Sequence, residues 1–256
     1  MKNIFFLFLC PFLFCQNFVT KDSIKILAQS NFKSMEVLEI NNGKLIPVRN
    51  YMYDRNKNEV IIKNISERNK DWLRTIIRLD SNFNIKEVER LTEGLVISEK
   101  ENLLVKTQVS EIMKYFYNSS TIQINHYNSK GNLSVKEFKL YDDKNRIIEK
   151  IKLLNIPDDI VVSEIEKYKW IDDYNYNYEK LNFNAPNSKV IGLYKLNEYG
   201  DREAFVGNLY LNNSKEKADF IFEKKNRKFD SKGNLIKVYK VDNKEQILIE
   251  VRNIIY

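Results

Sequence analysis

A short turn motif recurs along the chain and sets the strongest limit on its fold. Residues 229–235 read FDSKGNL, and residues 127–133 read YNSKGNL. The Asp or Asn in second place can accept hydrogen bonds from backbone amides two residues on. Gly131 and Gly233, in fifth place, can adopt a positive φ at no steric cost. This pattern is typical of a hairpin loop built on a type I turn followed by a left-handed residue, so we expect each copy to join two antiparallel strands.

Weaker copies lack the glycine but keep an Asp or Asn after an aromatic or aliphatic residue. Asn145 suits the left-handed place because Asn tolerates positive φ. Phe83, Lys57 and Glu245 do not suit it, so their copies need another turn or carry local strain. These copies cover residues 53–59, 79–85, 141–147 and 241–247, with shorter relatives at 40–45 and 196–201.

The segments between the turns alternate between apolar and polar residues. Ile122 and Ile124, for example, alternate with Gln123 and Asn125. A period of two indicates a sheet with one buried face. The 15 Tyr and 15 Phe also favour strands. We predict an all-β, mainly antiparallel fold, in which a meander of repeated β-hairpins forms a curved or extended sheet.

One segment departs from this alternation. Between residues 107 and 117 the apolar side chains are spaced i, i+3, i+4 and i+7, which places them on one face of a helix. Thr107 can cap its N-terminus. The sequence therefore predicts one short helix near 107–117, and Ile165 and Tyr168 suggest a second. The apolar positions of the first are Val109, Ile112, Met113 and Phe116.

The first fifteen residues have the features of a secretory signal peptide. Lys2 gives a positive start, and the apolar run 4–14 is shorter than the roughly 20 residues that span a bilayer. We predict cleavage between Cys15 and Gln16, because Cys is small at the −1 position. The domains are then a signal peptide, 1–15, and a single β-rich domain with hairpin repeats, 16–256. No later stretch has transmembrane length.

A lipoprotein acylated at Cys15 is the alternative. Acylation favours a small residue just before the cysteine, and Phe14 is bulky, so we favour export without a lipid, to the periplasm, the cell surface or the medium. Cys10 also lies in this region. The mature chain would therefore have no disulfide and no cysteine-based zinc site.

The residues that catalysis and metal binding need are scarce. His126 is the single histidine, no Gly-x-Ser-x-Gly elbow occurs, and His-rich metal sites are excluded by count. Adjacent carboxylates at 142–143, 158–159 and 172–173 would point to opposite faces of a strand. The segment 172–179 lacks the Gly of a calcium loop. We predict that the chain is not an enzyme and has neither cofactor nor metal.

The net charge is +7, and most charges are interspersed by sign. Residues 224–228 (KKNRK) form the one dense basic run. We interpret this run as a solvated turn, because nucleic-acid binding would need a broader basic stripe.

The frame aromatic-Asp-x-x-Gly-Asn-Leu resembles the YD repeats of bacterial Rhs-type surface and secreted proteins. It also resembles smaller exported proteins that carry degenerate hairpins of this kind. The copies are scattered from Tyr53 to Ile247. The resemblance implies a β-rich shell or strip with no chemistry of its own. A chain of 256 residues is too short for the large enclosing shell, so that function is not carried over.

Trp170, Tyr174, Tyr176 and Tyr178 are the candidate binding residues. If residues 174–178 are extended, the three tyrosines share a face and the intervening Asn amides share the other. Such an aromatic row could stack on sugar rings or on an extended peptide. The alternative, which we favour, is that the row faces the core, because Tyr is a good strand former whose hydroxyl can still reach the surface.

The sequence thus predicts an exported, non-enzymatic β-repeat protein that binds or scaffolds at the bacterial cell envelope. Its partner would be a glycan, a peptide or another envelope component, and not a nucleic acid. The alternative is a periplasmic carrier of an apolar ligand, which needs a continuous apolar concavity. The third option is a hydrolase, which needs a pocket with carboxylates clustered around His126 or Asp173.

Overall fold

The computed structural model of the chain describes most of the sequence. Within the described residues one helix and a single antiparallel sheet of seventeen strands are found. The prediction of an all-β antiparallel meander is therefore confirmed. The predicted signal peptide, 1–15, lies outside the described residues. These are 21–65, 73–97, 103–157, 159–184, 188–211, 214–242 and 245–256.

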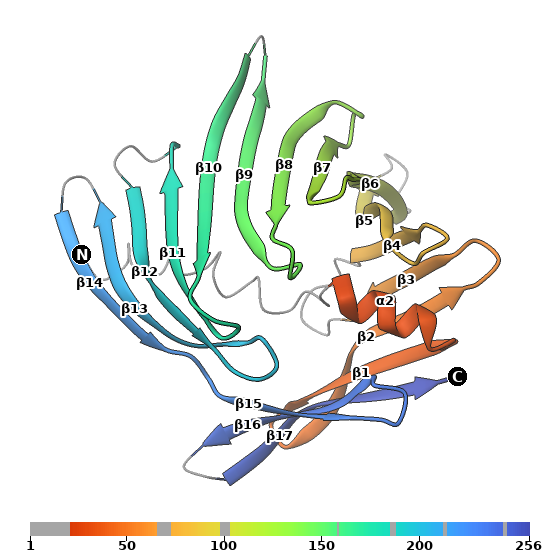
Figure 1. Cartoon of the computed structure of the whole chain (residues 1–256). Coiled ribbons are helices and arrows are strands. Elements are labelled where there is room, and N and C mark those ends of the chain that lie inside the picture. The colour runs from red at the N-terminus through yellow and green to blue at the C-terminus, as the bar shows by residue number, and fades with distance from the viewer. Residues whose placement is uncertain are drawn as a thin grey trace.

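The strands follow one another in the order of the sequence (Figure 1). The first nine are β1 (Ser34–Asn41), β2 (Lys44–Asp54), β3 (Glu59–Asn64), β4 (Leu73–Leu79), β5 (Ile85–Ile97), β6 (Leu103–Tyr117), β7 (Thr121–Asn128), β8 (Leu133–Tyr141) and β9 (Ile147–Ile156). The remaining eight are β10 (Asp159–Trp170), β11 (Asn175–Asn182), β12 (Ser188–Leu196), β13 (Arg202–Leu211), β14 (Ser214–Ile221), β15 (Lys225–Phe229), β16 (Leu235–Asp242) and β17 (Glu245–Ile255).

The sheet curves so far that its last strands reach its first. β1 pairs with β2 on one side and with β17 on the other, where Ser34 lies opposite Ile255. From β2 to β14 each strand pairs with the next, and β15, β16 and β17 pair likewise. Figure 1 shows the resulting arc, with the helix α2 (Lys21–Gln29) inside it.

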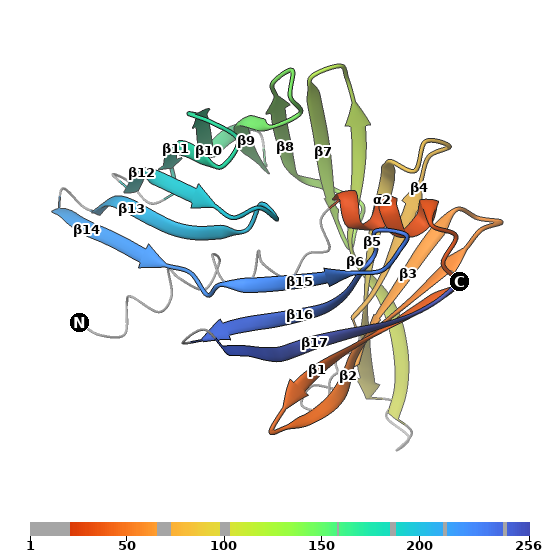
Figure 2. The same ribbon diagram turned by 60° about the horizontal axis from the view of Figure 1, so that its bottom comes forward.

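The arc changes direction where β14 passes into β15 (Figure 2). The amide of Phe222 still donates to the carbonyl of Glu203 in β13, whereas the carbonyl of Lys224 accepts from the amide of Val241 in β16. The chain thus exchanges one neighbouring strand for another within a few residues. No backbone ladder joins β14 to β15 among the described residues, so the sheet is open there.

The predicted turns have the expected geometry at the glycine copies. Gly131 and Gly233 have φ of 79° and 81°. Oδ1 of Asp230 accepts from the amides of Lys232 (2.9 Å) and Asn234 (2.8 Å). Oδ1 of Asn128 has the same role in the other copy.

Some of the weaker copies have a left-handed residue in fifth place, and one uses a different turn. Asn145 is left-handed, with φ 62°, and so is Phe83, with φ 61°, despite its ring. At residues 53–59 the left-handed residue is Asn58 (φ 51°) instead of Lys57. An Asn one place later therefore removes the strain that Lys57 would carry.

The predicted helix near 107–117 is wrong, because these residues lie in strand β6. Ser110 is the extra residue of a bulge, since Arg90 lies opposite Glu111 and Leu91 lies opposite Val109. A bulge shifts the phase of the alternation by one residue. Apolar residues on both faces of β6 then imitate a helical spacing. Ile165 and Tyr168 likewise lie in a strand, β10.

The helix that does form, α2, was not predicted. Ile24, Leu27 and Ala28 are buried at the spacing i, i+3, i+4. Just after the helix, Asn31 is left-handed, with φ 61°. The buried face of α2 and Phe32 pack on the concave face of β1–β7 and form the main core. The sheet residues of this core are Met35, Val37, Tyr51, Val60, Ile77, Leu79, Ile85, Val88, Met113, Ile122 and Ile124.

Candidate functional site

The concave face carries charges beside its apolar core. Residues directly opposite in adjacent strands lie on the same face. His126 lies opposite Met113 of the core, and Glu137 lies opposite Ile124, so both belong to the concave face. From β5 to β11 this face holds a ladder of ion pairs. They are Arg90–Glu111 (2.8 Å), His126–Glu111 (2.7 Å), Lys139–Glu137 (2.9 Å), Lys150–Glu166 (3.3 Å) and Lys180–Glu164 (2.6 Å).

Burial and charge act in opposite directions on Glu166. Burial would raise the pKa of this carboxyl, but the Lys150 ammonium and the hydrogen bond from the Tyr168 hydroxyl outweigh it and hold the pKa well below its usual range. Burial and a hydrogen bond with Glu166 instead raise the pKa of Glu164, despite Lys180 nearby. The fold thus favours a negative Glu166 clamped by lysines.

His126 is paired in the same way. Hydrogen bonding to His126 lowers the pKa of Glu111 more than burial raises it, and the positive Arg90 adds to this effect. The Nε2 atom of His126 is buried and has no hydrogen-bond partner among the described residues. Asp173, the other residue named for a hydrolase, lies in the surface turn beside Lys144 and Arg146. The two residues therefore do not share a pocket.

An aromatic cluster covers the concave face from β10 to β14. Tyr176 lies opposite Tyr194 (ring centroids 5.3 Å apart), and Tyr194 lies opposite Phe205 (4.6 Å). The Phe205 ring lies over two glycines that face each other, Gly192 and Gly207. A Cβ would approach this ring to 2.4 Å at Gly192 and 2.6 Å at Gly207. The two glycines therefore make room for the ring.

The four candidate binding residues do not form one row. Tyr176 and Tyr178 lie in the aromatic cluster and are only 4% and 2% exposed. Trp170 lies at its margin, where its indole Nε1 donates to the carbonyl of Ile147 (2.8 Å) and Arg146 covers its ring at 5.0 Å. Tyr174 precedes β11 and is 50% exposed. Burial thus separates Tyr174 from the other two tyrosines.

Tyr174 belongs to a turn at the rim of the sheet, residues 171–174, which we call the rim turn. Ile171 is also exposed, at 60%. A hollow of about 470 Å³ lies beside the rim turn toward β9 and is lined by Arg146 and Trp170 among others. A second hollow, of about 400 Å³, lies toward β12 and is lined by Tyr174 itself. We call them the Trp170 hollow and the Tyr174 hollow.

Asp172 fixes the rim turn. Its Oδ1 accepts from the amides of Tyr174 (2.7 Å) and Asn175 (2.7 Å). The Asn175 side-chain amide also donates to this carboxylate, and these hydrogen bonds lower the pKa of Asp172. On the other side, the amide of Leu196 donates to the carbonyl of Tyr174 (2.7 Å). The backbone at Tyr174 is therefore held from two directions while its ring remains exposed.

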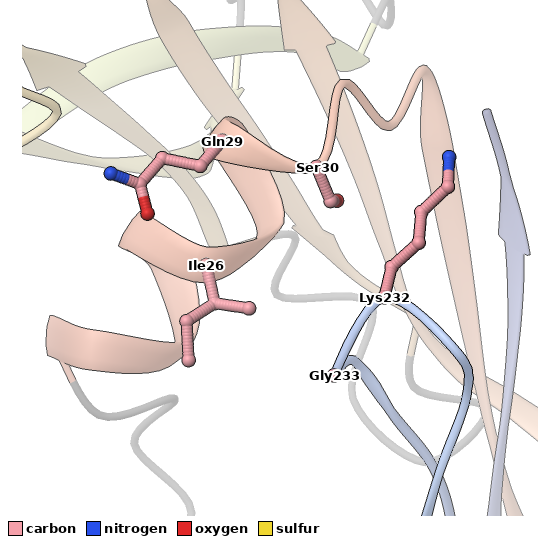
Figure 3. Close-up of a pocket in the computed structure, with 5 residues that line it drawn as sticks. All are labelled: Ile26, Gln29, Ser30, Lys232 and Gly233. Atoms are coloured by element: carbon pink, nitrogen blue, oxygen red, sulfur yellow. The ribbon is translucent and has the colours of Figure 1, made fainter.

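A third hollow, of about 570 Å³, lies between the end of α2 and the turn before β16 (Figure 3). Its polar groups do not converge, since Gln29 and Lys232 point in different directions (Figure 3). The Lys232 ammonium lies 3.4 Å from the centroid of the Tyr256 ring, and the Ser30 hydroxyl donates to Leu27. Because specific binding needs a few convergent polar groups, the rim is the better candidate.

The sequence missed most of the residues that line the Tyr174 hollow. The interpretation of residues 224–228 as a solvated turn is wrong, because Lys225–Phe229 form strand β15. Lys224 and Lys225 are part of the wall of the hollow together with Lys195 and Tyr199. The dense basic run beside a structural corner is the signal that could have indicated them. Their approach to the rim turn depends on the curvature of the sheet, which no local pattern shows.

No protein-family model and no curated protein sequence matches the chain. Among solved structures, a porin-like protein from Bacteroides uniformis is similar with a TM-score of 0.38 and 7% identity, over 87% of this chain and 96% of that one. Within the described residues no helix is long and apolar enough to cross a membrane. Nor do three or more His, Cys, Asp or Glu side chains gather there as a metal site would require.

Proposed function

We propose that the chain is an exported, non-enzymatic binding protein of the bacterial cell envelope, and that the rim turn with its two flanking hollows is the binding surface. The observation that carries this proposal is the exposure of Ile171 and Tyr174 on a turn whose backbone is fixed. A turn whose backbone is already fixed loses little backbone entropy when it binds a partner. The YD-like hairpins supply the scaffold.

The concave face favours a scaffold over a carrier of apolar ligands. A carrier needs a continuous apolar concavity, but here charges such as Glu166 and Lys150 cross the face between the helix-covered core and the aromatic cluster. Exposing these charges to an apolar ligand would cost free energy. The rim therefore remains the surface on which a ligand is best accommodated.

Export is tested by N-terminal sequencing of the protein isolated from its host. We expect the mature chain to begin at Gln16. An intact Met1 on a cytosolic protein would contradict export, and a lipid on Cys15 would replace the free form by an anchored one.

Binding is tested by sedimentation of the purified chain with isolated envelopes of its host. The double variant Ile171→Ala/Tyr174→Ala removes the exposed side chains of the rim turn and should no longer co-sediment. Phe116→Ala is the matched control, because Phe116 is 49% exposed but lies on β6, away from the rim turn. Co-sedimentation that the double variant retains would overturn the rim as the binding surface.

A further inference from the structure

The Tyr174 hollow lies where three parts of the chain meet. The rim turn forms one wall, the β12–β13 hairpin forms the second, and the start of β15 forms the third. Its volume of about 400 Å³ falls in the range of roughly 300–1,000 Å³ that is usual for small-molecule sites. The hollow can therefore enclose part of a small polar ligand.

The charges of this hollow do not all cancel. Lys195 pairs with Glu203 (3.4 Å) and Lys225 pairs with Glu223 (3.8 Å). Glu198 accepts a hydrogen bond from the Tyr199 hydroxyl, which raises the pKa of Tyr199. Among the described residues no ion pair engages the exposed Lys224. The lining holds three lysines (Lys195, Lys224 and Lys225) and two glutamates (Glu198 and Glu203), so the wall keeps one net positive charge.

The neighbouring groups suit a ring with hydroxyls. The exposed face of Tyr174 offers a stacking surface that the rim turn holds in place. The side-chain amide of Asn226 also lines the hollow and makes no hydrogen bond to any described residue. An amide of this kind can both donate to and accept from a sugar hydroxyl.

We infer that the Tyr174 hollow binds an acidic sugar, with the pyranose ring stacked on Tyr174, the carboxylate paired with Lys224 and a hydroxyl bonded to Asn226. This inference rests on the proposed function and names the class of its ligand. Charge attracts an acidic peptide equally well, but most residues that line the hollow are polar or charged and can bond to hydroxyls, and the Tyr174 ring offers a face on which a sugar ring can stack. The sugar therefore satisfies more of the groups that are present.

The test is isothermal titration of the purified full chain with three probes. Trigalacturonate carries the carboxylates, galactotriose is its neutral counterpart, and triglutamate has the same number of side-chain carboxylates without sugar rings. We expect trigalacturonate to bind at least about tenfold more tightly than galactotriose, the ratio that corresponds to one charge-assisted hydrogen bond. It should also bind about tenfold more tightly than triglutamate, which has no ring to stack on Tyr174. Its affinity should fall with added salt.

Three variants localise the binding. Lys224→Gln should lower the affinity for trigalacturonate about fivefold, as loss of a partly exposed ion pair does. Tyr174→Ala should lower this affinity about tenfold, because the stacking surface is lost. Lys228→Gln is the matched control, because Lys228 is an exposed lysine of the same basic run that does not line the hollow. It should leave the affinity unchanged.

The outcomes separate this inference from the proposed function. Equal loss in Lys228→Gln and Lys224→Gln would mean non-specific attraction, and tighter binding of galactotriose or triglutamate would mean another ligand class. Either result overturns the acidic sugar while envelope binding through the rim turn can still hold. If the Ile171→Ala/Tyr174→Ala variant still sediments with envelopes, the rim turn is not the envelope-binding surface and the proposed function fails. The titration then tests only whether the Tyr174 hollow binds an acidic sugar.

Discussion

At the scale of the residue, each glycine-containing hairpin turn requires one residue with a left-handed backbone. Gly233 has φ 81°, and a Cβ added there would meet no atom within 4 Å. The cost of a side chain is therefore purely conformational. Asn145 and Phe83 adopt the same left-handed region, at φ 62° and 61°. The motif therefore tolerates residues other than glycine at some loss of stability.

Gly233→Val should destabilise the fold by about 1–2 kcal/mol, because a β-branched residue is strained at positive φ. Urea unfolding of variant and parent measures this difference. Gly233→Asn is the control and should cost clearly less. Equal stability of Gly233→Val and the parent would refute the left-handed assignment.

The aromatic residues differ sharply in their surroundings. Tyr176→Ala should destabilise by about 3–5 kcal/mol, as loss of a buried aromatic side chain does. Tyr174→Ala should cost less than about 1 kcal/mol, because its side chain is half exposed and only its backbone is engaged. Denaturant unfolding of both variants gives the comparison. Similar losses in the two would contradict the separation of core from rim.

At the scale of the element, α2 contributes through one face. Leu27 is 3% exposed and Ile26 is 41% exposed, although they are neighbours. Leu27→Ala should destabilise by about 2–5 kcal/mol through cavity formation, and Ile26→Ala by less than about 1 kcal/mol. Thermal and urea unfolding measure both. If Leu27→Ala were as mild as Ile26→Ala, the helix would not be a part of the core.

The strands were predictable because their signals are local. A turn motif with Asp230 and Gly233 fixes a hairpin within seven residues, and alternation in the flanks gives its buried face. The helix was misplaced for a related reason. The bulge at Ser110 breaks the alternation of β6, while the i, i+3, i+4 spacing of Ile24, Leu27 and Ala28 covers too short a segment to stand out.

The site was only partly predictable, since it depends on contacts between distant segments. Tyr174 was named, but its separation from Tyr176 follows from Asp172, which bends the chain just before β11. Lys224 reaches the same hollow because the sheet turns a corner after β14. Local patterns show the turn and the basic run, and only the curvature of the sheet brings them together.

At the scale of the whole molecule, the concave face of the single curved sheet is covered by one helix and by its own side chains, because no second sheet packs on it in the described part of the chain. The helix fills the concave side at β1–β7, aromatic rings fill it at β10–β14, and ion pairs cover the region between. Buried ion pairs contribute little net stability compared with apolar groups, but the loss of one partner is costly. The middle of the sheet should therefore be its acid-sensitive part.

Acid should weaken the fold below about pH 4, near the ordinary pKa of a glutamate. The pKa of Glu111, Glu137 and Glu166 is lower in the folded chain than usual. The stability that such a group contributes is present above its unfolded pKa and is lost as the pH falls through the folded one. The pKa of Glu164 is raised, so this group stabilises the fold as the pH falls. Because three glutamates lose their contribution in acid and one gains, the net effect of acid is a loss of stability.

The variant Glu166→Gln tests this directly. At pH 7 it leaves Lys150 without its closest carboxylate, so we expect a loss of about 3 kcal/mol in the free energy of unfolding. As the pH falls toward 3, Glu166 becomes protonated in the unfolded parent, and the difference in the free energy of unfolding between parent and variant becomes smaller. Glu216→Gln, at an exposed position of β14, should follow the parent at every pH. Urea unfolding between pH 7 and 3 gives all three curves. A gap between parent and Glu166→Gln that stays constant with pH would show that the ion-pair ladder does not govern the acid stability of the sheet.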